Sequence, residues 1–397
     1  MSDRPGIDRP PRTWLMLGHK VGDNGQILAL AEGLGWPYEV KHLVYRRTEL
    51  LTNLLAGPTL MGLVRERSSP LEPPWPELVI SAGRRNEPLV RWIQREAGGP
   101  GKVRLVHVGR PWARHECFDL IVTTPQYRLP EKPNILHNEA PLHRVTAARL
   151  EAAAAEAERR FAHLPRPFVA VIMGGNAGPY RFDRENGALL GYSASRMARE
   201  LGGSVLATSS ARTPAAAIDA LEAELAVPAF LYRFRRDDPD NPYLAILAAA
   251  DRLIVTCDSM SMLAEAIATQ KPVFIFDFSR GKGSHRPPLP PHIARRSLFE
   301  RLLDLRLQPI VYRLGMLVGP RRLTRDVTII HRRQIAAGRA VWLGDPWPPP
   351  MPPPGPLRDL ERAVAAVKRL FDPGYVPRTS VPQAGSIGSE LIARLFQ

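Results

Sequence analysis

The most informative residues for chemistry lie in a short polar turn between an apolar run and a predicted helix. Residues 253–257 read Leu-Ile-Val-Thr-Cys, which predicts a buried strand, and Asp258 and Ser259 follow it. A helix that starts near Ser261 would present unpaired N–H groups and the positive end of its dipole, a geometry that favours phosphate. Glu265 shares a helix face with Ser261 and could accept hydrogen bonds from ribose hydroxyls. An ordinary strand–turn–helix crossover is the alternative. The donor-binding residues expected here are Asp258, Ser259, Ser261, Met262 and Glu265.

A glycine-rich turn follows another apolar run, residues 168–173. It reads Gly174, Gly175, Asn176, and glycine lets a backbone approach a phosphate closely. The turn matches a dinucleotide fingerprint only in part. We expect these three residues to contact the donor phosphates, with a plain strand-to-helix turn as the alternative.

The strand predicted at 204–209 ends in hydroxyl groups and an arginine instead of an acidic residue. A Rossmann dehydrogenase would place an acid there to hold a ribose, so the pattern argues against NAD. Thr208, Ser209 and Arg212 suit a diphosphate instead. A helix N-cap before Pro214 explains the hydroxyls equally well.

In the first half of the chain, candidate residues follow the strand predicted at 14–17. We expect residues 18–26 to form a loop and a helix to begin at Ile27. Asp23 or His19 is the candidate general base for a sugar hydroxyl, and a flexible turn is the alternative. The residues expected on the acceptor or phosphate side are Gly22 and Gln26 of this loop and Arg84 and Arg85 after the strand at 78–81.

Short apolar runs that alternate with helical periods predict parallel sheets built from βαβ units. The chain of 397 residues exceeds one usual core, so we expect two domains. The predicted boundaries are 1–165 for an acceptor-side domain, 166–345 for a nucleotide-sugar domain, and 346–397 for a Pro-rich linker and a terminal helix that packs back on the first domain. A helix is also expected at 48–65.

Composition limits the function classes. The net charge is +15 and the pI about 10.3, which favours anionic partners such as nucleotide phosphates or an anionic membrane surface. The arginine pairs are scattered and no aromatic platform accompanies them, so a nucleic-acid partner is not expected. The two cysteines, Cys117 and Cys257, and the histidine spacing predict neither a disulfide framework nor a metal site. The polar N-terminus predicts no secretory signal, so a cytoplasmic location is expected, with peripheral attachment at the inner membrane as an option.

Two successive αβ halves, each with a glycine-rich turn after its first strand, resemble the GT-B glycosyltransferases. The chain is identified as a member of the ELM1 family (DUF1022), which occurs in plants and many bacteria. The segments that carry the resemblance are 18–26, 79–85, 171–178 and 256–262 with Glu265. The resemblance implies two Rossmann-like doubly wound domains facing a cleft. It also implies a nucleotide-sugar donor on the second domain, a glycan or lipid-linked acceptor on the first, and no metal or other cofactor.

The expected function is therefore a metal-independent glycosyltransferase that uses a nucleotide-diphosphate sugar. Helix dipoles and backbone amides would stabilise the leaving diphosphate. Two alternatives stay open: a nucleotide-sugar epimerase of the same fold, which needs no acceptor, and a non-catalytic ELM1-like adaptor.

Overall fold

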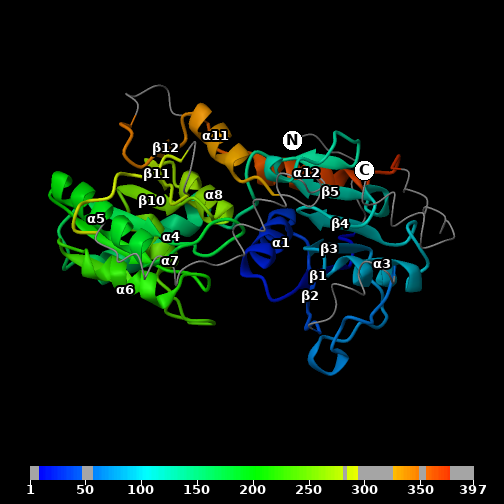
Figure 1. Ribbon diagram of the computed structural model, residues 1–397. Coiled ribbons are helices and arrows are strands. Elements are labelled where there is room, and N and C mark those ends of the chain that lie inside the picture. Colours follow the sequence, from blue (N-terminus) through cyan, green and yellow to red (C-terminus); the bar gives the residue numbers. More distant parts are fainter. Residues whose placement is uncertain (1–8, 47–56, 280–283, 294–324, 348–354, 376–397) are drawn as a thin grey trace, which may run out of the picture. The chain divides into compact units, whose positions relative to one another are not determined.

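Two compact units make up the described chain. The computed structural model describes residues 9–46, 57–279, 284–293, 325–347 and 355–375. The first unit comprises residues 1–144, 320–325 and 357–397, and the second comprises 145–319 and 326–356, insofar as these are described. Each unit contains its own six-stranded parallel sheet (Figure 1). The predicted α/β class with two Rossmann-like domains is confirmed, and their arrangement about a cleft stays a prediction.

The order in which strands are added to the first sheet reverses after its first two strands. Its strand order is β2-β1-β3-β4-β5-β6, and every pairing is parallel. Because β2 lies on one side of β1 and all later strands lie on the other, the topological switch point falls between β1 and β3. Open α/β sheets bind ligands at this point, beyond the carboxyl ends of the strands. The strands are β1 (Thr13–Leu17), β2 (Tyr38–His42), β3 (Leu78–Ala82), β4 (Arg104–Val108), β5 (Leu120–Thr123) and β6 (Ile135–His137).

Helices cover both faces of this sheet, which is why β1 and β3 are buried along their whole length. One face packs on α1 (Val21–Leu34) and α12 (Asp359–Arg369), and the other packs on α3 (Glu87–Glu96). The short 3-10 helices of this unit are η1 (Arg65–Arg67), η2 (His115–Cys117) and η3 (Pro125–Tyr127).

Helix α12 joins the first unit although it comes near the end of the described chain. Its Asp359 carboxylate accepts the backbone N–H groups of Glu139 and Ala140 at 2.9 and 3.0 Å. Ala363 and Val367 are buried against α1, and Figure 1 shows α12 beside β5. The helical period at 357–371 thus packs on the sheet of the first unit.

Two predicted elements of the first unit are wrong. Helix α1 begins at Val21, not at Ile27, so Gly22, Asp23 and Gln26 lie in its first two turns instead of in a loop. Only part of the helix predicted at 48–65 can be compared, because residues 47–56 lie outside the described residues. The part from residue 57 to 64 forms turns, since Gly57 has φ +60° and Pro58 follows it.

The sheet of the second unit has the strand order of Rossmann folds. The order is β12-β11-β10-β7-β8-β9, again with every pairing parallel. Read from the other edge it corresponds to 3-2-1-4-5-6, with the switch point between β7 and β10. The strands are β7 (Phe168–Ile172), β8 (Ser204–Thr208), β9 (Ala229–Tyr232), β10 (Arg252–Thr256), β11 (Val273–Phe276) and β12 (Val341–Trp342).

The second unit begins at Val145, ahead of the boundary predicted at residue 165. Its first helix packs on α7, and Phe161 at the end of that helix makes edge contacts with Phe168 and Phe230. The prolines near residue 165 therefore end a helix of this unit and do not separate two units. Its helices within the described residues are α4 (Ala147–Phe161), α5 (Arg184–Leu201), α6 (Ala215–Ala223), α7 (Tyr243–Ala249), α8 (Met260–Ala268) and α11 (Thr328–Ala336).

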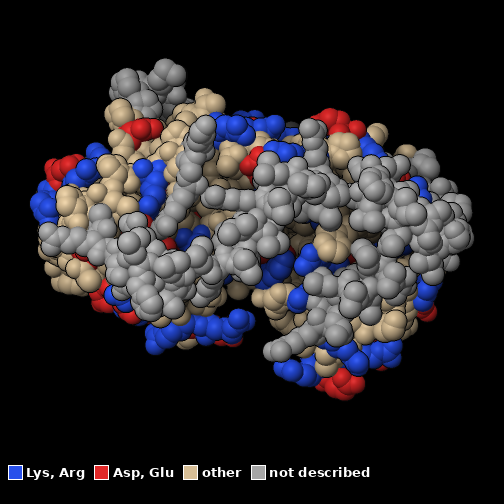
Figure 2. All heavy atoms as spheres, viewed as in Figure 1, with Lys and Arg blue, Asp and Glu red and all other residues tan. Residues whose placement is uncertain are grey.

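No helix within the described ranges combines the length and the apolar character that a bilayer crossing requires. On the face shown in Figure 2, Lys and Arg side chains are spread among acidic and other residues instead of forming one block.

Candidate functional site

The donor residues predicted for the second unit gather at its switch point. They follow β7, β8 and β10, three neighbouring strands whose carboxyl ends share one edge of the sheet. The Asp258 carboxylate accepts the N–H of Gly175 at 2.9 Å and the hydroxyl of Thr256 at 2.8 Å. It also pairs with the Arg212 guanidinium at 2.8 Å. One carboxylate thus connects the turns after all three strands.

Asp258 is a structural residue at this site. Its side chain has no exposed surface, whereas that of Arg212 is 41% exposed. Burial raises the pKa of Asp258 above its usual value, and this effect outweighs the opposing influence of Arg212 and of the hydrogen bonds. The prediction that Asp258 contacts the donor directly is therefore corrected, because its oxygens face the neighbouring turns.

The glycine turn after β7 is similarly closed. The N–H groups of Gly174, Gly175 and Asn176 are donated to Thr256, Asp258 and the carbonyl of Arg212. They are not available to a phosphate, which corrects the prediction that these amides hold it. The glycines are required instead for close packing. A Cβ on Gly174 would lie 2.4 Å from the Asp258 carboxylate, and one on Gly175 would lie 2.1 Å from the Arg212 carbonyl oxygen.

Thr208 and Ser209 are also committed to internal contacts. Both are buried, and the Ser209 hydroxyl accepts the N–H of Phe234 at 2.9 Å. The Thr208 hydroxyl lies 3.4 Å from the Ser209 carbonyl. This arrangement does not support their predicted contact with a diphosphate, because both residues are buried and both hydroxyls contact protein atoms.

The N-terminus of α8 has unpaired backbone N–H groups of the kind that bind a phosphate. Within the described chain, the N–H groups of Met260, Ser261 and Met262 have no hydrogen-bond acceptor, and Ser259 does not cap them with its side chain. These groups carry the positive end of the helix dipole. Arg212 pairs with Asp258, which comes two residues before this helix, and remains half-exposed.

Glu265 lies one turn further along α8, as the sequence predicts. It is half-buried, and the hydroxyl of Tyr243 donates to its carboxylate at 2.5 Å. Burial raises the pKa of Glu265 to about 7, and the hydrogen bond from Tyr243 opposes that rise. Its second carboxylate oxygen has no partner among the described residues, which leaves it available to a hydroxyl ligand.

In the first unit, the residues predicted for the acceptor side meet across the switch point between β1 and β3. The Arg85 guanidinium donates to the exposed His19 ring at 3.2 Å, and an accepting ring nitrogen carries no proton. Lys20 lies 3.8 Å from the Asp23 carboxylate. Gly83 approaches Asp23 so closely that a Cβ there would lie 2.9 Å from the carboxylate. His19, Asp23 and Arg85 thus share one edge of the sheet.

Gly22 and Gln26 lie in the first two turns of α1 and contact each other. Gly22 is exposed in the first turn of α1, and its carbonyl accepts the Gln26 side-chain amide at 3.5 Å. The sequence reading missed Asn24, which holds the β1–α1 turn by bonding both the N–H and the carbonyl of Gly18, at 3.0 and 2.7 Å. An Asn that follows a glycine turn is a typical signal for such a clamp.

Arg84 has a different neighbour from Arg85. Its guanidinium lies 4.4 Å from the centre of the Trp112 ring, in a cation–π contact. The sequence reading also missed Glu87, a buried carboxylate that accepts the N–H groups of Trp112 and Ala113 at 2.9 and 2.7 Å. Burial raises the pKa of Glu87 to about 7 against the effect of these bonds. An acidic residue at a predicted helix start is the sequence signal that could have identified Glu87.

Among the described residues, no three His, Cys, Asp or Glu side chains are grouped as metal ligands require. Cys117 and Cys257 are free thiols.

Comparison with known proteins identifies relatives over most of this region. The family model described as "Mitochondrial fission ELM1" matches residues 21–287. An uncharacterised protein of Rickettsia prowazekii is 24% identical over 296 residues, which is 66% of this chain and 82% of that protein. The mitochondrial fission protein ELM1 of Arabidopsis thaliana is 28% identical over 236 residues, 54% of each chain. The chain therefore spans about half the length of the Arabidopsis protein.

Solved structures with similar folds have low sequence identity. A glycosyltransferase from Rickettsia africae has a TM-score of 0.45 and 10% identity, over 83% of this chain and 98% of that one. A UDP-GlcNAc 2-epimerase from Neisseria meningitidis bound to UDP-GlcNAc has a TM-score of 0.43 and 11% identity, over 90% and 100%. The fold class therefore rests on the two sheets themselves, and these likenesses carry no argument about activity.

Proposed function

Because this chain belongs to the mitochondrial fission ELM1 family, we propose that its two switch points serve a metal-independent glycosyltransferase. The enzyme moves a sugar from a nucleotide-diphosphate donor to a glycan or lipid-linked acceptor. The observation that carries the proposal is the group of unpaired N–H donors at the start of α8 beside Arg212, at the switch point between β7 and β10.

On the donor side, the diphosphate binds the N–H groups of Ser261 and Met262, and Arg212 supplies a charged hydrogen bond. Glu265 accepts from the ribose hydroxyls through its unpaired carboxylate oxygen. Gly174 and Gly175 act indirectly, because they allow the turn after β7 to pack closely against Asp258 and the Arg212 backbone. These positive groups stabilise the negative charge that develops on the leaving diphosphate.

On the acceptor side, His19 or Asp23 takes the proton of the acceptor hydroxyl. The hydroxyl oxygen forms a bond to the anomeric carbon while the bond from that carbon to the diphosphate oxygen breaks. The electron pair leaves with the diphosphate. His19 takes the proton only when its ring leaves Arg85, because a neutral imidazole has one basic nitrogen and Arg85 occupies it.

The test is transfer in the presence of a chelator. The full chain is incubated with UDP-, GDP-, dTDP- and CMP-linked sugars and a panel of glycan and lipid acceptors, and both the released nucleotide and the modified acceptor are measured. We expect release that depends on an acceptor and persists in EDTA. A new sugar nucleotide formed from donor alone would establish the epimerase instead, and absence of any product with every donor would favour the adaptor.

We place this activity in the cytoplasm or at the inner membrane surface. The net charge of +15 favours anionic lipid, and each basic residue near such a surface contributes about 1 kcal/mol. Sedimentation with vesicles that contain anionic lipid, compared with neutral vesicles, tests the membrane part of the proposal.

A further inference from the structure

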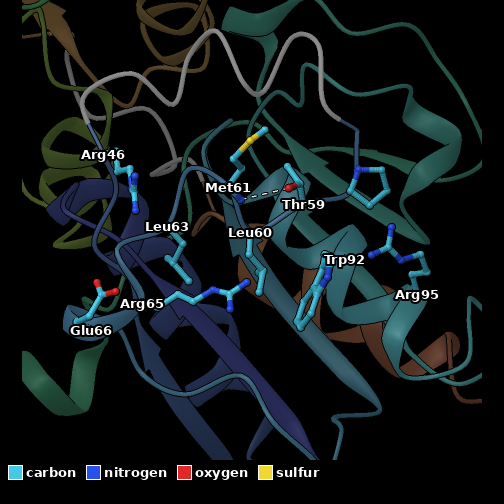
Figure 3. Close-up of a pocket in the computed structure, with 10 residues that line it drawn as sticks. Arg46, Thr59, Leu60, Met61, Leu63, Arg65, Glu66, Trp92 and Arg95 are labelled. Carbon is cyan, nitrogen blue, oxygen red and sulfur yellow. Dashed lines mark hydrogen bonds between the residues drawn. The ribbon is translucent and has the colours of Figure 1, made fainter.

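A cavity of about 450 Å³ lies in the first unit, away from the residues assigned above (Figure 3). It is formed by residues 58–66 on one side and by helix α3 on the other. Three arginines from three different segments line it: Arg46 after β2, Arg65 at the start of η1, and Arg95 near the end of α3. Figure 3 shows Leu60 and Trp92 lying between Arg65 and Arg95.

The described residues that line this cavity carry an unbalanced charge. Among them Glu66 is the only acidic one, and Arg95 pairs with Glu96 at 2.8 Å. The side chains of Arg46 and Arg65 form no ion pair or hydrogen bond with any other described residue. Guanidinium groups without a carboxylate partner favour a phosphate, which accepts two hydrogen bonds from each.

Apolar side chains share the same walls. Leu60, Met61 and Trp92 line the cavity, and Met61 is 59% exposed. Trp92 is held in place by an edge contact with Trp75, with ring centres 6.0 Å apart. A free phosphate needs no such wall, whereas a phosphate attached to a hydrocarbon chain would bury apolar surface against it.

A second cavity of only about 10 Å³ adjoins this one. It shares Thr59 and Leu63 with the larger cavity and is also lined by Tyr45 and Arg85. Arg85 in turn contacts His19. The lining residues therefore form a continuous series from the three arginines to the switch point between β1 and β3.

We propose that this cavity binds the acceptor, and that the acceptor is a phosphorylated amphiphile. Its phosphate pairs with Arg46 and Arg65, the first part of its hydrocarbon chain contacts Trp92 and Met61, and its sugar-accepting hydroxyl reaches toward Arg85 and His19. The inference rests on the proposed function for the role of the ligand, but the binding itself does not require a donor.

The test is calorimetric binding of a soluble probe to the full chain with no sugar nucleotide present. The probe is dihexanoyl phosphatidic acid below its critical micelle concentration. Inorganic phosphate and dihexanoyl phosphatidylcholine are the comparison ligands, and each isolates one half of the recognition. Arg65→Gln and Met61→Ser are the test variants, because both side chains are exposed and their loss should not affect folding. Arg67→Gln is the matched control, since Arg67 belongs to the same 3-10 helix but does not line the cavity.

We expect the probe to bind the parent chain and the Arg67→Gln variant equally well. Arg65→Gln should weaken binding roughly tenfold, because a charged hydrogen bond is lost. Met61→Ser should weaken it roughly threefold. Inorganic phosphate should bind much more weakly than the probe.

Three results would overturn the proposal: no binding of the probe, equal affinity for inorganic phosphate, or binding only above the micelle concentration, which would indicate a surface for aggregates instead. If the chain binds a sugar nucleotide but not the probe, only the proposed acceptor site is wrong. If it binds the probe but no sugar nucleotide, the proposed binding cavity stands and the proposed transferase is wrong.

Discussion

The two switch points have the same topological origin but opposite character. In the second unit, the turn amides of Gly174, Gly175 and Asn176 are all donated within the protein, and a fully buried Asp258 connects the strand ends. In the first unit, Asn24 fixes the turn after β1, while His19 and Lys20 remain exposed. One edge is fixed by internal bonds, and the other presents side chains that can exchange protons.

This difference suggests a division of work. A fixed backbone keeps the free N–H groups of α8 and the Arg212 side chain in position, which suits binding of a constant group such as a diphosphate. Exposed titratable side chains suit proton transfer to an acceptor. Sequence motifs at the two edges look alike because both contain glycine and polar residues, so only the hydrogen bonds distinguish them.

The largest effect should come from the exposed edge. If His19 or Asp23 is the base, replacing it (His19→Ala or Asp23→Asn) should reduce the transfer rate 10²- to 10⁴-fold, while donor binding stays unchanged. Rates at saturating donor measure this. His42→Ala is the control, because His42 is exposed at the end of β2 and its hydrogen bonds with Ser69 use only its backbone N–H and carbonyl. If both test variants keep the full rate, neither His19 nor Asp23 is the base.

The fixed edge should be sensitive to added volume. Gly175→Ala should destabilise the second unit by about 3 kcal/mol or more, because its Cβ would meet the Arg212 carbonyl at 2.1 Å and its φ is +151°. Urea unfolding measures the change. Gly355→Ala is the control, since its Cβ would lie in open space. Equal stability of the two variants would show that the turn after β7 is not fixed.

The two edges also differ in the burial of their ion pairs. Asp258→Asn removes a buried charge that pairs with Arg212 at 2.8 Å, whereas Asp23→Asn removes a partly exposed charge 3.8 Å from Lys20. We expect a loss of about 2 kcal/mol in unfolding free energy for the first and less than about 0.5 kcal/mol for the second. Unfolding of both variants under the same conditions is the measurement, and equal losses would contradict the distinction.

The smallest effect is a pH dependence that both edges share. The pKa of Glu265 is raised to about 7, so the folded state keeps a proton that the unfolded state loses near its ordinary value of 4.5. Unfolding then releases a proton, and stability from this group falls as pH rises from about 4.5 to about 7.

Glu265→Gln should remove this part of the slope, which we expect to be about 1 kcal/mol because the side chain is partly exposed. Glu87→Gln is the matched variant in the first unit, where the pKa is also about 7. Unfolding free energies at pH 5 and pH 7.5 provide the measurement. A variant that keeps the full slope of the parent would exclude its carboxylate as the cause.

Much of the fold could be predicted from apolar runs, but strand order could not. The run at 253–257 and the start of α8 follow from residue type and spacing, and so does the position of Glu265 on that helix. The sequence did not indicate that β10 pairs with β7, so it could not show that Asp258 faces the glycine turn. A polar residue before a helix looks the same whether it points toward solvent or toward a neighbouring turn.

Local signals also failed where glycine was involved. Gly22 and Gly25 suggested a loop, yet both lie within α1, where packing of Ile27 and Leu30 in the core stabilises the helix. The short β12 and the helix α11 before it were missed, because a two-residue strand has too few positions for a pattern.

Metal-independent binding of a sugar nucleotide beside Arg212 can be measured by calorimetric titration of the full chain with UDP-, GDP-, dTDP- and CMP-linked sugars in the presence of EDTA. The Arg212→Gln variant is titrated in parallel, with Gly355→Ala as the control. We predict that at least one sugar nucleotide binds without metal, and that Arg212→Gln weakens this binding roughly tenfold while the control does not. Absence of binding by every donor, or equal affinity in the Arg212→Gln variant, would contradict it.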